Sequence, residues 1–263
     1  MPRIGRAVLV LLAGLALPLA AHAETWELKF EAYGGGLPLA TGGLRLAIDG
    51  SKRYDARLES ANASWFNMLT RFRYDAEAAG TVSNPSVAPL RFRGERNLRS
   101  KREVTALNYA GGGVSVHTEP PMNPEKASLV PESIRRGSVD PLSAGIGVVV
   151  TAGGPAACTG TYPVYDGRRR YDITAKPAGT EMLEPSKRRM ASGLAKRCIV
   201  SLKPVAGFQT DKDRPNRFFV EGQERSATLW FLPVNGRTIP IQVEVETDFG
   251  SFFVHTTGFT VTP

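Results

Sequence analysis

The sequence predicts an all-β protein built on one large, strongly curved antiparallel sheet with a short helix. Three observations support this class: most segments alternate apolar and polar residues, glycine-rich or Asn-Gly turns separate them, and only one stretch carries a helix-capping pattern. About a dozen strands with one apolar face must curl, because flat open sheets rarely reach that size. We therefore expect an open half-barrel or β-spiral with an apolar concave side.

The first 23 residues have the features of a cleavable signal peptide. Arg3 and Arg6 precede an apolar stretch over residues 7–20, and Ala21-His22-Ala23 matches an A-x-A cleavage signal. We expect cleavage after Ala23, a single domain over residues 24–263, and export to the periplasm of a Gram-negative bacterium. The alternative is an uncleaved anchor, although the apolar stretch is shorter than the roughly twenty residues that a transmembrane helix requires. No later segment is expected to span a membrane.

The first half of the processed chain alternates clearly. Strands are expected at Thr25–Tyr33 and around Leu44, Leu46 and Ile48, which share one face. Further strands are expected over residues 52–60, 68–74, 90–96, 102–109 and 114–119. Glycine-rich turns separate several of them, as turns between strands require.

The middle of the chain is expected to interrupt the sheet. Prolines are dense between residues 120 and 137, which indicates a loop. Asp140 can then cap a short helix through Leu142, Ser143 and Ala144, which ends over residues 148–150.

The C-terminal third contains the strongest hairpin signal, Asn235-Gly236. Centred on this turn, the register places Trp230 opposite Ile241 and Leu232 opposite Ile239. We expect Ile241 to point inward, together with Val243 and Val245.

A second hairpin is expected to close at Phe249-Gly250. Its register pairs Val245 with Val254 on the buried face and Glu244 with His255 on the solvated face. The chain would thus end in a three-stranded meander.

Cys158 and Cys198 are the only cysteines, and an even pair in an exported protein predicts one disulfide. We expect it to join neighbouring strands, with Arg168–Thr174 antiparallel to Lys196–Leu202 and a turn near residues 177–179. The alternative, a redox-active pair, lacks the C-x-x-C spacing typical of such sites.

Motifs for catalysis, cofactors and metals are missing from the sequence. It has no G-x-S-x-G elbow, P-loop or dinucleotide fingerprint, and Asp248-Phe249-Gly250 stands in a hairpin without other kinase elements. His117 and His255 have no second ligand at metal-binding spacing. We expect no enzymatic activity, no cofactor and no metal.

Positive charge is concentrated in short runs, and the formal net charge is +8. Arg91 and Arg93 share one strand face, and Arg168 and Arg170 share another. These rows could bind lipid phosphates or an anionic envelope surface, or form a solvated face that blocks edge-to-edge aggregation. Nucleic acid is not expected, because no aromatic residues interleave with the basic ones.

The segment Tyr162–Asp172, YPVYDGRRRYD, resembles the V-[FY]-D-G-R-R-R-[FY]-[DN] motif of exported bacterial proteins grouped as domain of unknown function 3108. Other pieces match in order: Asp140–Ala144, then Cys198 with Pro204, Ala206, Gly207 and Phe208, then Leu229-Trp230 and Ile239-Pro240-Ile241. The resemblance covers nearly the whole processed chain. It implies no known activity, but it does imply a curved antiparallel sheet similar to the open half-barrels that carry lipoproteins.

The central motif also has a physical interpretation. Asp166-Gly167 allows a bulge or tight turn, after which Arg168 and Arg170 lie on one side and Arg169 and Tyr171 on the other. An arginine on a buried face needs a carboxylate. The candidates are Asp140, Asp166 and Asp172, so we expect Asp140, Ser143, Asp166, Gly167 and Tyr171 to be structural.

The leading hypothesis is a non-enzymatic periplasmic protein that binds a lipid or a lipidated protein in the concave face. The candidate binding residues are Leu46, Trp230, Ile241 and Val243, with Arg91, Arg93, Arg168 and Arg170 for an anionic head group. One alternative is an envelope scaffold whose interior is filled by Trp65, Phe66 or the helix after Asp140. The other is an uncharacterised hydrolase that uses Asp140, Ser143, Asp166 and Arg168.

Overall fold

The computed structural model describes residues 23–65, 71–83, 86–125, 129–208, 224–247 and 250–263. The expected signal peptide lies outside the described residues except for Ala23. Strands dominate, and the expected fold class is confirmed: thirteen antiparallel strands form one sheet. In chain order the strands are β1 Glu24–Gly34, β2 Leu37–Ile48, β3 Arg53–Asn62, β4 Phe72–Ser83, β5 Ser86–Leu98, β6 Lys101–Ala110, β7 Gly113–Glu119, β8 Gly160–Tyr165, β9 Arg170–Leu183, β10 Gly193–Ala206, β11 Arg225–Val234, β12 Arg237–Thr247 and β13 Gly250–Thr262.

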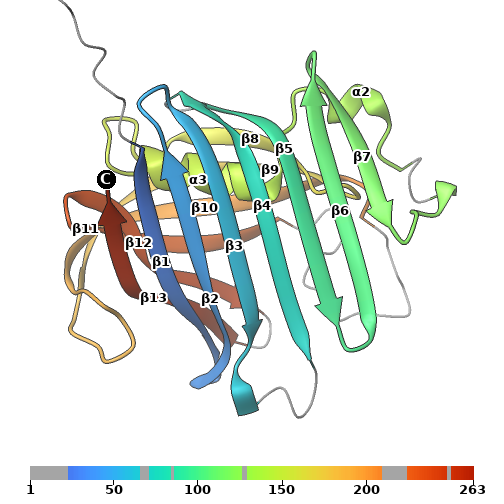
Figure 1. The fold of residues 1–263 in the computed structure, drawn as a ribbon. Helices are drawn as coiled ribbons and strands as arrows, with labels where there is room; N and C mark the ends of the chain where they lie inside the picture. Colours follow the sequence, from blue (N-terminus) through green and yellow to red (C-terminus); the bar gives the residue numbers. More distant parts are fainter. Residues whose placement is uncertain (1–22, 66–70, 84–85, 126–128, 209–223, 248–249) are drawn as a thin grey trace, which may run out of the picture.

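Two meanders form this sheet, and they meet at the first and last strands. The order is β7-β6-β5-β4-β3-β2-β1-β13-β12-β11-β10-β9-β8, so each strand pairs with its sequence neighbour except at the β1–β13 junction. There Leu28 pairs with Phe259 and both side chains are buried. The sheet curls so that the two halves face each other (Figure 1). We call them the N-terminal wall (β1–β7) and the C-terminal wall (β8–β13).

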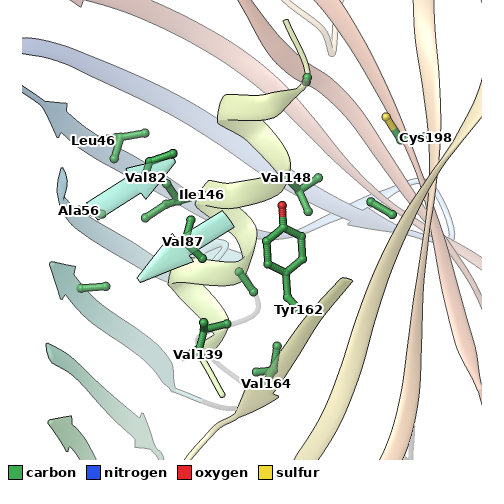
Figure 2. Close-up of a cluster of buried hydrophobic side chains, with 14 of the residues drawn as sticks. Leu46, Ala56, Val82, Val87, Val139, Ile146, Val148, Tyr162, Val164 and Cys198 are labelled. Carbon is green, nitrogen blue, oxygen red and sulfur yellow. The ribbon is translucent and has the colours of Figure 1, made fainter. Parts of the chain in front are cut away.

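Helix α3 (Pro141–Thr151) fills the middle of the concave, inner face. Asp140 caps it, as expected, and Pro141 occupies the first turn, where a missing N–H costs nothing. The helix contacts β4 and β5 of one wall and β8 and β12 of the other. Figure 2 shows Leu46, Val87 and Val164 from the two walls around Ile146 and Val148 of this helix. Because these side chains are buried, the helix closes most of the concave face.

Small residues let α3 approach the N-terminal wall closely. Ala56 on β3 and Ala76 and Ala78 on β4 are all buried. Ala56 and Ala78 are directly opposite each other in the pairing of the two strands. Gly147 allows the same close approach to β8 of the C-terminal wall, because a Cβ at this position would lie 2.7 Å from Cε1 of Tyr162. The alanine-rich part of β4, residues 75–83, was not expected as strand from the sequence pattern.

The two outer edges of the sheet, β7 and β8, are not paired with each other within the described residues. The connection between them contains the short helix α2 (Glu132–Arg135) and runs on to α3. Its Gly137 N–H donates to Gly112 O at the β6–β7 turn, and Val139 forms a parallel bridge to Val164 of β8. This connection therefore pairs with part of the β8 edge and is also bonded to the turn that precedes β7.

The Asn235-Gly236 hairpin is confirmed, but one expected pair in it is wrong. Asn235 and Gly236 both have positive φ, and Leu232 pairs with Ile239 as expected. A bulge between Trp230 and Phe231 then shifts the register, so that Trp230 pairs with Gln242 rather than Ile241. Trp230 consequently shares a face with Gln242, whereas Ile241 is fully buried on the opposite, inner face.

The register of the last hairpin is two residues away from the expected one. Thr247 pairs with Gly250, and its Oγ1 donates to Gly250 O at 2.7 Å. The turn itself, residues 248 and 249, lies outside the described residues. The expected pairs Val245–Val254 and Glu244–His255 are replaced by the pairs Val243–Val254, Val245–Phe252, Glu244–Phe253 and Gln242–His255.

A disulfide joins Cys158 and Cys198, as expected, with 5.4 Å between the Cα atoms. It does not join neighbouring strands, because Cys158 lies before β8 and β9 stands between β8 and β10. The expected pairing of β9 with β10 is confirmed, with Thr174 opposite Ser201. The turn between them is not at residues 177–179, since β9 continues to Leu183.

Candidate functional site

A cleft of about 660 Å³ lies at the end of the inner face beyond the N-terminus of α3. We call it the Arg168 cleft. It is formed where the ends of β5 and β10, the starts of β4, β6 and β9, and the β8–β9 turn converge. Both walls contribute, so it stands in the part of the concave face that α3 leaves open. Its lining residues are Tyr74, Phe92, Gly94, Arg96, Glu103, Thr105, Pro141, Asp166, Arg168, Arg169, Tyr171, Gly207 and Phe208.

Aromatic rings form the apolar part of this cleft. Tyr171 and Phe208 make an edge-to-face contact with 6.3 Å between ring centroids. On the opposite wall, burial raises the pKa of Tyr74 to about 12, and the nearby Asp166 carboxylate adds to this effect. Both tyrosines lining the cleft therefore stay neutral at physiological pH and offer ring surface and a hydroxyl.

The β8–β9 turn presents the basic part of the cleft, and Asp166 holds this turn in shape. Its Oδ1 accepts hydrogen bonds from the backbone N–H groups of Arg168 and Arg169, at 3.0 and 2.7 Å. Its Oδ2 pairs with the guanidinium of Arg169 at 2.7 Å. Gly167 has a φ of +90°, which favours glycine at this position. Asp166 and Gly167 thus act structurally, as expected, and leave Arg168 exposed at the cleft.

Two further arginines, Arg169 and Arg96, also line the cleft. Arg169 lies over the ring of Phe208, with 5.7 Å from Cζ to the centroid. Arg96, across the cleft on β5, donates to Glu103 of β6 at 2.6 Å. Guanidinium groups therefore line both walls of the cleft.

Arg170 is not part of the cleft. Its guanidinium is largely buried and pairs with Asp172 at 2.7 Å, and it also donates to Tyr171 O. We expected Arg168 and Arg170 to lie on the same side of one strand, and this expectation is wrong. Arg168 lies in the β8–β9 turn, whereas Arg170 is the first residue of β9. The expectation that a buried arginine needs a carboxylate holds here, with Asp172 as the partner.

Arg91 and Arg93 lie on the outer face of β5, away from the cleft. Arg91 pairs with Asp55 at 3.1 Å and Arg93 with Glu95 at 3.5 Å. A hydrogen bond from Arg102 is the main reason that the pKa of Glu95 falls to about 2. These residues belong to a network of exposed ion pairs on the N-terminal wall, so the structure does not bring this basic row to Arg168.

Asp140 and Ser143 form a buried network beside the cleft rather than within it. Asp140 accepts hydrogen bonds from the N–H and the Oγ of Ser143, at 2.8 and 2.5 Å, and Tyr54 Oη lies 2.6 Å from that Oγ. Burial raises the pKa of Asp140 to about 6, although the hydrogen bonds of Ser143 oppose this rise. Both residues are fully buried, and their geometry is that of a helix cap.

The apolar candidates from the sequence do not gather in one open groove. Leu46 and Ile241 are fully buried in the core, and Val243 is half-buried. The indole N–H of Trp230 donates to Glu181 Oε2 at 3.1 Å. The residues that the sequence analysis missed are Tyr74, Phe92, Glu103 and Thr105, which come from the wall opposite the D-G-R-R-R segment.

Two features are absent from the part of the chain that the structure describes. No group of three or more His, Cys, Asp or Glu residues there is arranged to hold a metal ion. In the same residues, no helix has the length and apolar character needed to cross a membrane.

The family comparison agrees with the sequence motifs. The sequence model of a family described as "Protein of unknown function (DUF3108)" matches residues 29–257. Among solved structures, the chain is similar to a β-barrel-like protein of domain of unknown function DUF1849 from Brucella abortus. That match has a TM-score of 0.49 and 8% sequence identity, and it covers 93% of this chain and 99% of that one. No curated protein matches the chain.

Proposed function

The chain belongs to the DUF3108 family of proteins of unknown function, and from this premise we propose that it is a non-enzymatic periplasmic protein that binds an anionic amphipathic ligand in the Arg168 cleft. The observation that carries the proposal is the composition of the cleft. It joins aromatic surface to guanidinium groups in a volume of about 660 Å³. Ligand pockets commonly have volumes of about 300–1,000 Å³.

The division of the cleft suits a ligand with two unlike ends. Phe92, Tyr171 and Phe208 offer ring surface to an acyl chain or another apolar group, and each buried methylene contributes about 0.8 kcal/mol. Arg168 is exposed at the cleft, and its planar fork matches a carboxylate or a phosphate. The ligand class is therefore a lipid, or the acyl part of a lipidated protein, with an anionic group at the β8–β9 turn.

The position of the ligand differs from the one expected from the sequence. The central concave face holds α3, so an acyl chain is proposed to enter only the end of that face. Of the four arginines expected from the sequence to hold the head group, only Arg168 lines the cleft, because Arg91 and Arg93 lie on the outer face and Arg170 pairs with Asp172.

The scaffold function is the second candidate, and α3 is the observation that favours it. This helix packs against both walls with a buried face that includes Ile146 and Val148. A sheet whose interior is filled in this way can support partners on its outer face without a ligand.

Ligand titration separates the two candidates. We expect a fluorescent fatty acid and a short-chain phosphatidylglycerol to bind saturably and to compete for one site. The exposed Arg168 can be replaced without disturbing the core, and Arg168→Gln should weaken binding about tenfold, equivalent to about 1.4 kcal/mol.

Arg91→Gln is the matched control, since it removes an exposed arginine from the outer face and should leave the affinity unchanged. Native mass spectrometry of the protein purified from the periplasm, followed by organic extraction, should reveal co-purified lipid. Absence of saturable binding of both probes would exclude the ligand-binding function and favour the scaffold.

A further inference from the structure

Three exposed apolar side chains gather at one corner of the sheet, around the β1–β2 turn. Leu37 is 55% exposed, Trp65 42% and Phe252 39%. Trp65 is held against this turn because its indole N–H donates to Pro38 O at 2.6 Å. Gly34 pairs with Leu37 of β2 on one side and with Phe252 of β13 on the other, so these two residues flank a position that has no side chain. We call Leu37, Trp65 and Phe252 the apolar corner.

Exposed cations lie at the same end of the sheet. Arg188, from the long β9–β10 connection, donates to Gly36 O at 3.1 Å and stacks on Tyr33, so it is fixed at the turn that carries Leu37. Arg71 and Arg99 are joined by a backbone hydrogen bond of 2.7 Å, from Arg99 N–H to Arg71 O, at the base of β4 and the β5–β6 turn. Among the described residues, no carboxylate lies within ion-pair distance of these three arginines.

This end differs from the outer face of the N-terminal wall. There, arginines such as Arg57 and Arg73 alternate with carboxylates and pair with them. At the apolar corner Arg188 lies beside exposed apolar side chains instead, and one exposed carboxylate, Glu246, is near Phe252 because it pairs with Ser251. Arg71 and Arg99 lie further along the same end of the sheet, at the β3–β4 and β5–β6 connections. The surface therefore has the two components of an interfacial membrane anchor: apolar side chains that enter the head-group region, and basic residues that attract anionic lipids.

The shape of the corner also favours a membrane over a rigid protein partner. Its side chains come from three separate segments: the start of β2, the residues that follow β3, and the start of β13. Protruding side chains on separate segments suit a fluid interface, and tryptophan, with an apolar ring and a polar N–H, is enriched at that depth.

We propose that this end of the sheet docks on an anionic membrane surface, with the apolar corner inserted among the head groups and Arg71, Arg99 and Arg188 facing lipid phosphates. The Arg168 cleft lies toward the same end, because Arg96 and Glu103 of its lining pair with each other two rows before the last pair of the β5–β6 hairpin, Leu98–Lys101. The docking proposal does not require that the cleft bind lipid.

Tryptophan fluorescence with vesicles tests this proposal directly. Trp26 and Trp230 are buried, so Trp65 is the only exposed tryptophan of the three in the chain. Vesicles of phosphatidylglycerol and phosphatidylethanolamine should shift its emission to shorter wavelength and protect it from acrylamide. Trp65→Phe should abolish both changes without loss of vesicle binding in a sedimentation assay.

Sedimentation with matched variants tests which residues act. Leu37→Ser/Trp65→Ser/Phe252→Ser should reduce vesicle binding about tenfold or more. The control Leu90→Ser/Met182→Ser/Leu194→Ser removes three apolar side chains elsewhere that are more exposed than those of the corner, and it should bind normally.

A second pair of variants, one at the proposed docking end and one control, tests whether the arginines contribute to vesicle binding. Arg71→Gln/Arg99→Gln should weaken binding and its dependence on salt. Lys52→Gln/Arg53→Gln removes two exposed cations at the opposite end, where Lys52 shares the positive φ of Arg99, and should have no effect.

Two outcomes would overturn the proposal: wild-type protein that does not bind anionic vesicles, or equal losses in the corner variants and their controls. Arg168→Gln should bind vesicles normally, which separates a failure of docking from a failure of the cleft.

Discussion

The phenolic oxygen of Tyr54 lies 2.6 Å from Oγ of Ser143, and this contact joins β3 of the N-terminal wall to the first turn of α3. Ser143 is in turn bonded to Asp140, which caps the helix. The interior helix is therefore attached to the sheet by a buried polar chain as well as by apolar packing, and a buried chain of this kind fixes one orientation of the helix.

The carboxyl of Asp140 should make stability depend on pH. Its pKa is about 6 in the folded protein because of burial, against an ordinary value of 3.8 for aspartate. Between pH 3.8 and pH 6, the folded state keeps the Asp140 proton and the unfolded state releases it. The stabilisation by this proton is therefore complete below about pH 4 and is lost as pH rises through 6. The loss is roughly 3 kcal/mol.

Urea unfolding at several pH values checks this prediction. Asp140→Asn keeps the capping oxygen but cannot titrate, so the difference in unfolding free energy between wild type and variant should change sharply between pH 4 and 7. Exposed carboxylates such as Glu95 are common to both proteins and cancel in that difference. A constant difference over this range would contradict the prediction.

The disulfide should contribute strongly to stability. Its bridge closes a loop with a sequence separation of 40 residues. Replacing both Cys158 and Cys198 by Ser should lower the unfolding free energy by about 4 kcal/mol on the chain-entropy model. Guanidinium denaturation of the variant, compared with the oxidised wild type, measures this loss, and the reduced wild type should be destabilised by a similar amount. Equal stability of oxidised and reduced wild type would refute the estimate.

Two glycines of α3 should respond in opposite directions to alanine. Gly145 is exposed and a Cβ there would meet no heavy atom within 4 Å, so Gly145→Ala should stabilise the protein by about 1 kcal/mol. Gly147→Ala would drive a methyl group into Tyr162 and should destabilise it by about 1–3 kcal/mol. Thermal melting of both variants provides the comparison, and changes of the same sign would show that Tyr162 does not constrain the helix.

Processing should leave Glu24 as the first residue. N-terminal sequencing of protein recovered from the periplasm tests this, and recovery of Met1 would contradict it. In the structure, the carboxylate of Glu24 bonds to Arg237 and to the indole of Trp26, which holds the start of β1 against the β11–β12 turn. Glu24→Gln should therefore weaken this end of β1 without affecting cleavage after Ala23.

Local signals in the sequence were sufficient for several features. The Asp140 cap, the Asn235-Gly236 turn and the disulfide each depend on neighbouring residues or on a simple count, and all three are present. The Trp230 pairing failed because a bulge changes the alignment without any residue that marks it. The last hairpin slipped by two residues because alternation is preserved by such a shift.

The alanine-rich part of β4 illustrates a different limit. Ala76 and Ala78 have low strand propensity, and their small size is explained only by the helix that packs against them. The same reason applies to the Arg168 cleft, because Arg96 and Arg168 come from opposite walls. Strand alternation describes each wall separately, and only the curl of the sheet determines which residues of the two walls meet.

The junction of β1 with β13 has a consequence for how the chain reaches its native state. A chain made from its N-terminus presents β1 first, yet the partner of β1 on one side is the last strand. Until β13 is complete, the hydrogen-bonding edge of β1 stays open to any other extended segment, and contacts between such distant residues form slowly. The β1–β13 pairing at the centre of the sheet is therefore the last to form. Before it forms, β1 is the strand along which the nascent protein is most vulnerable to aggregation, although β1 has a partner on both sides in the folded protein.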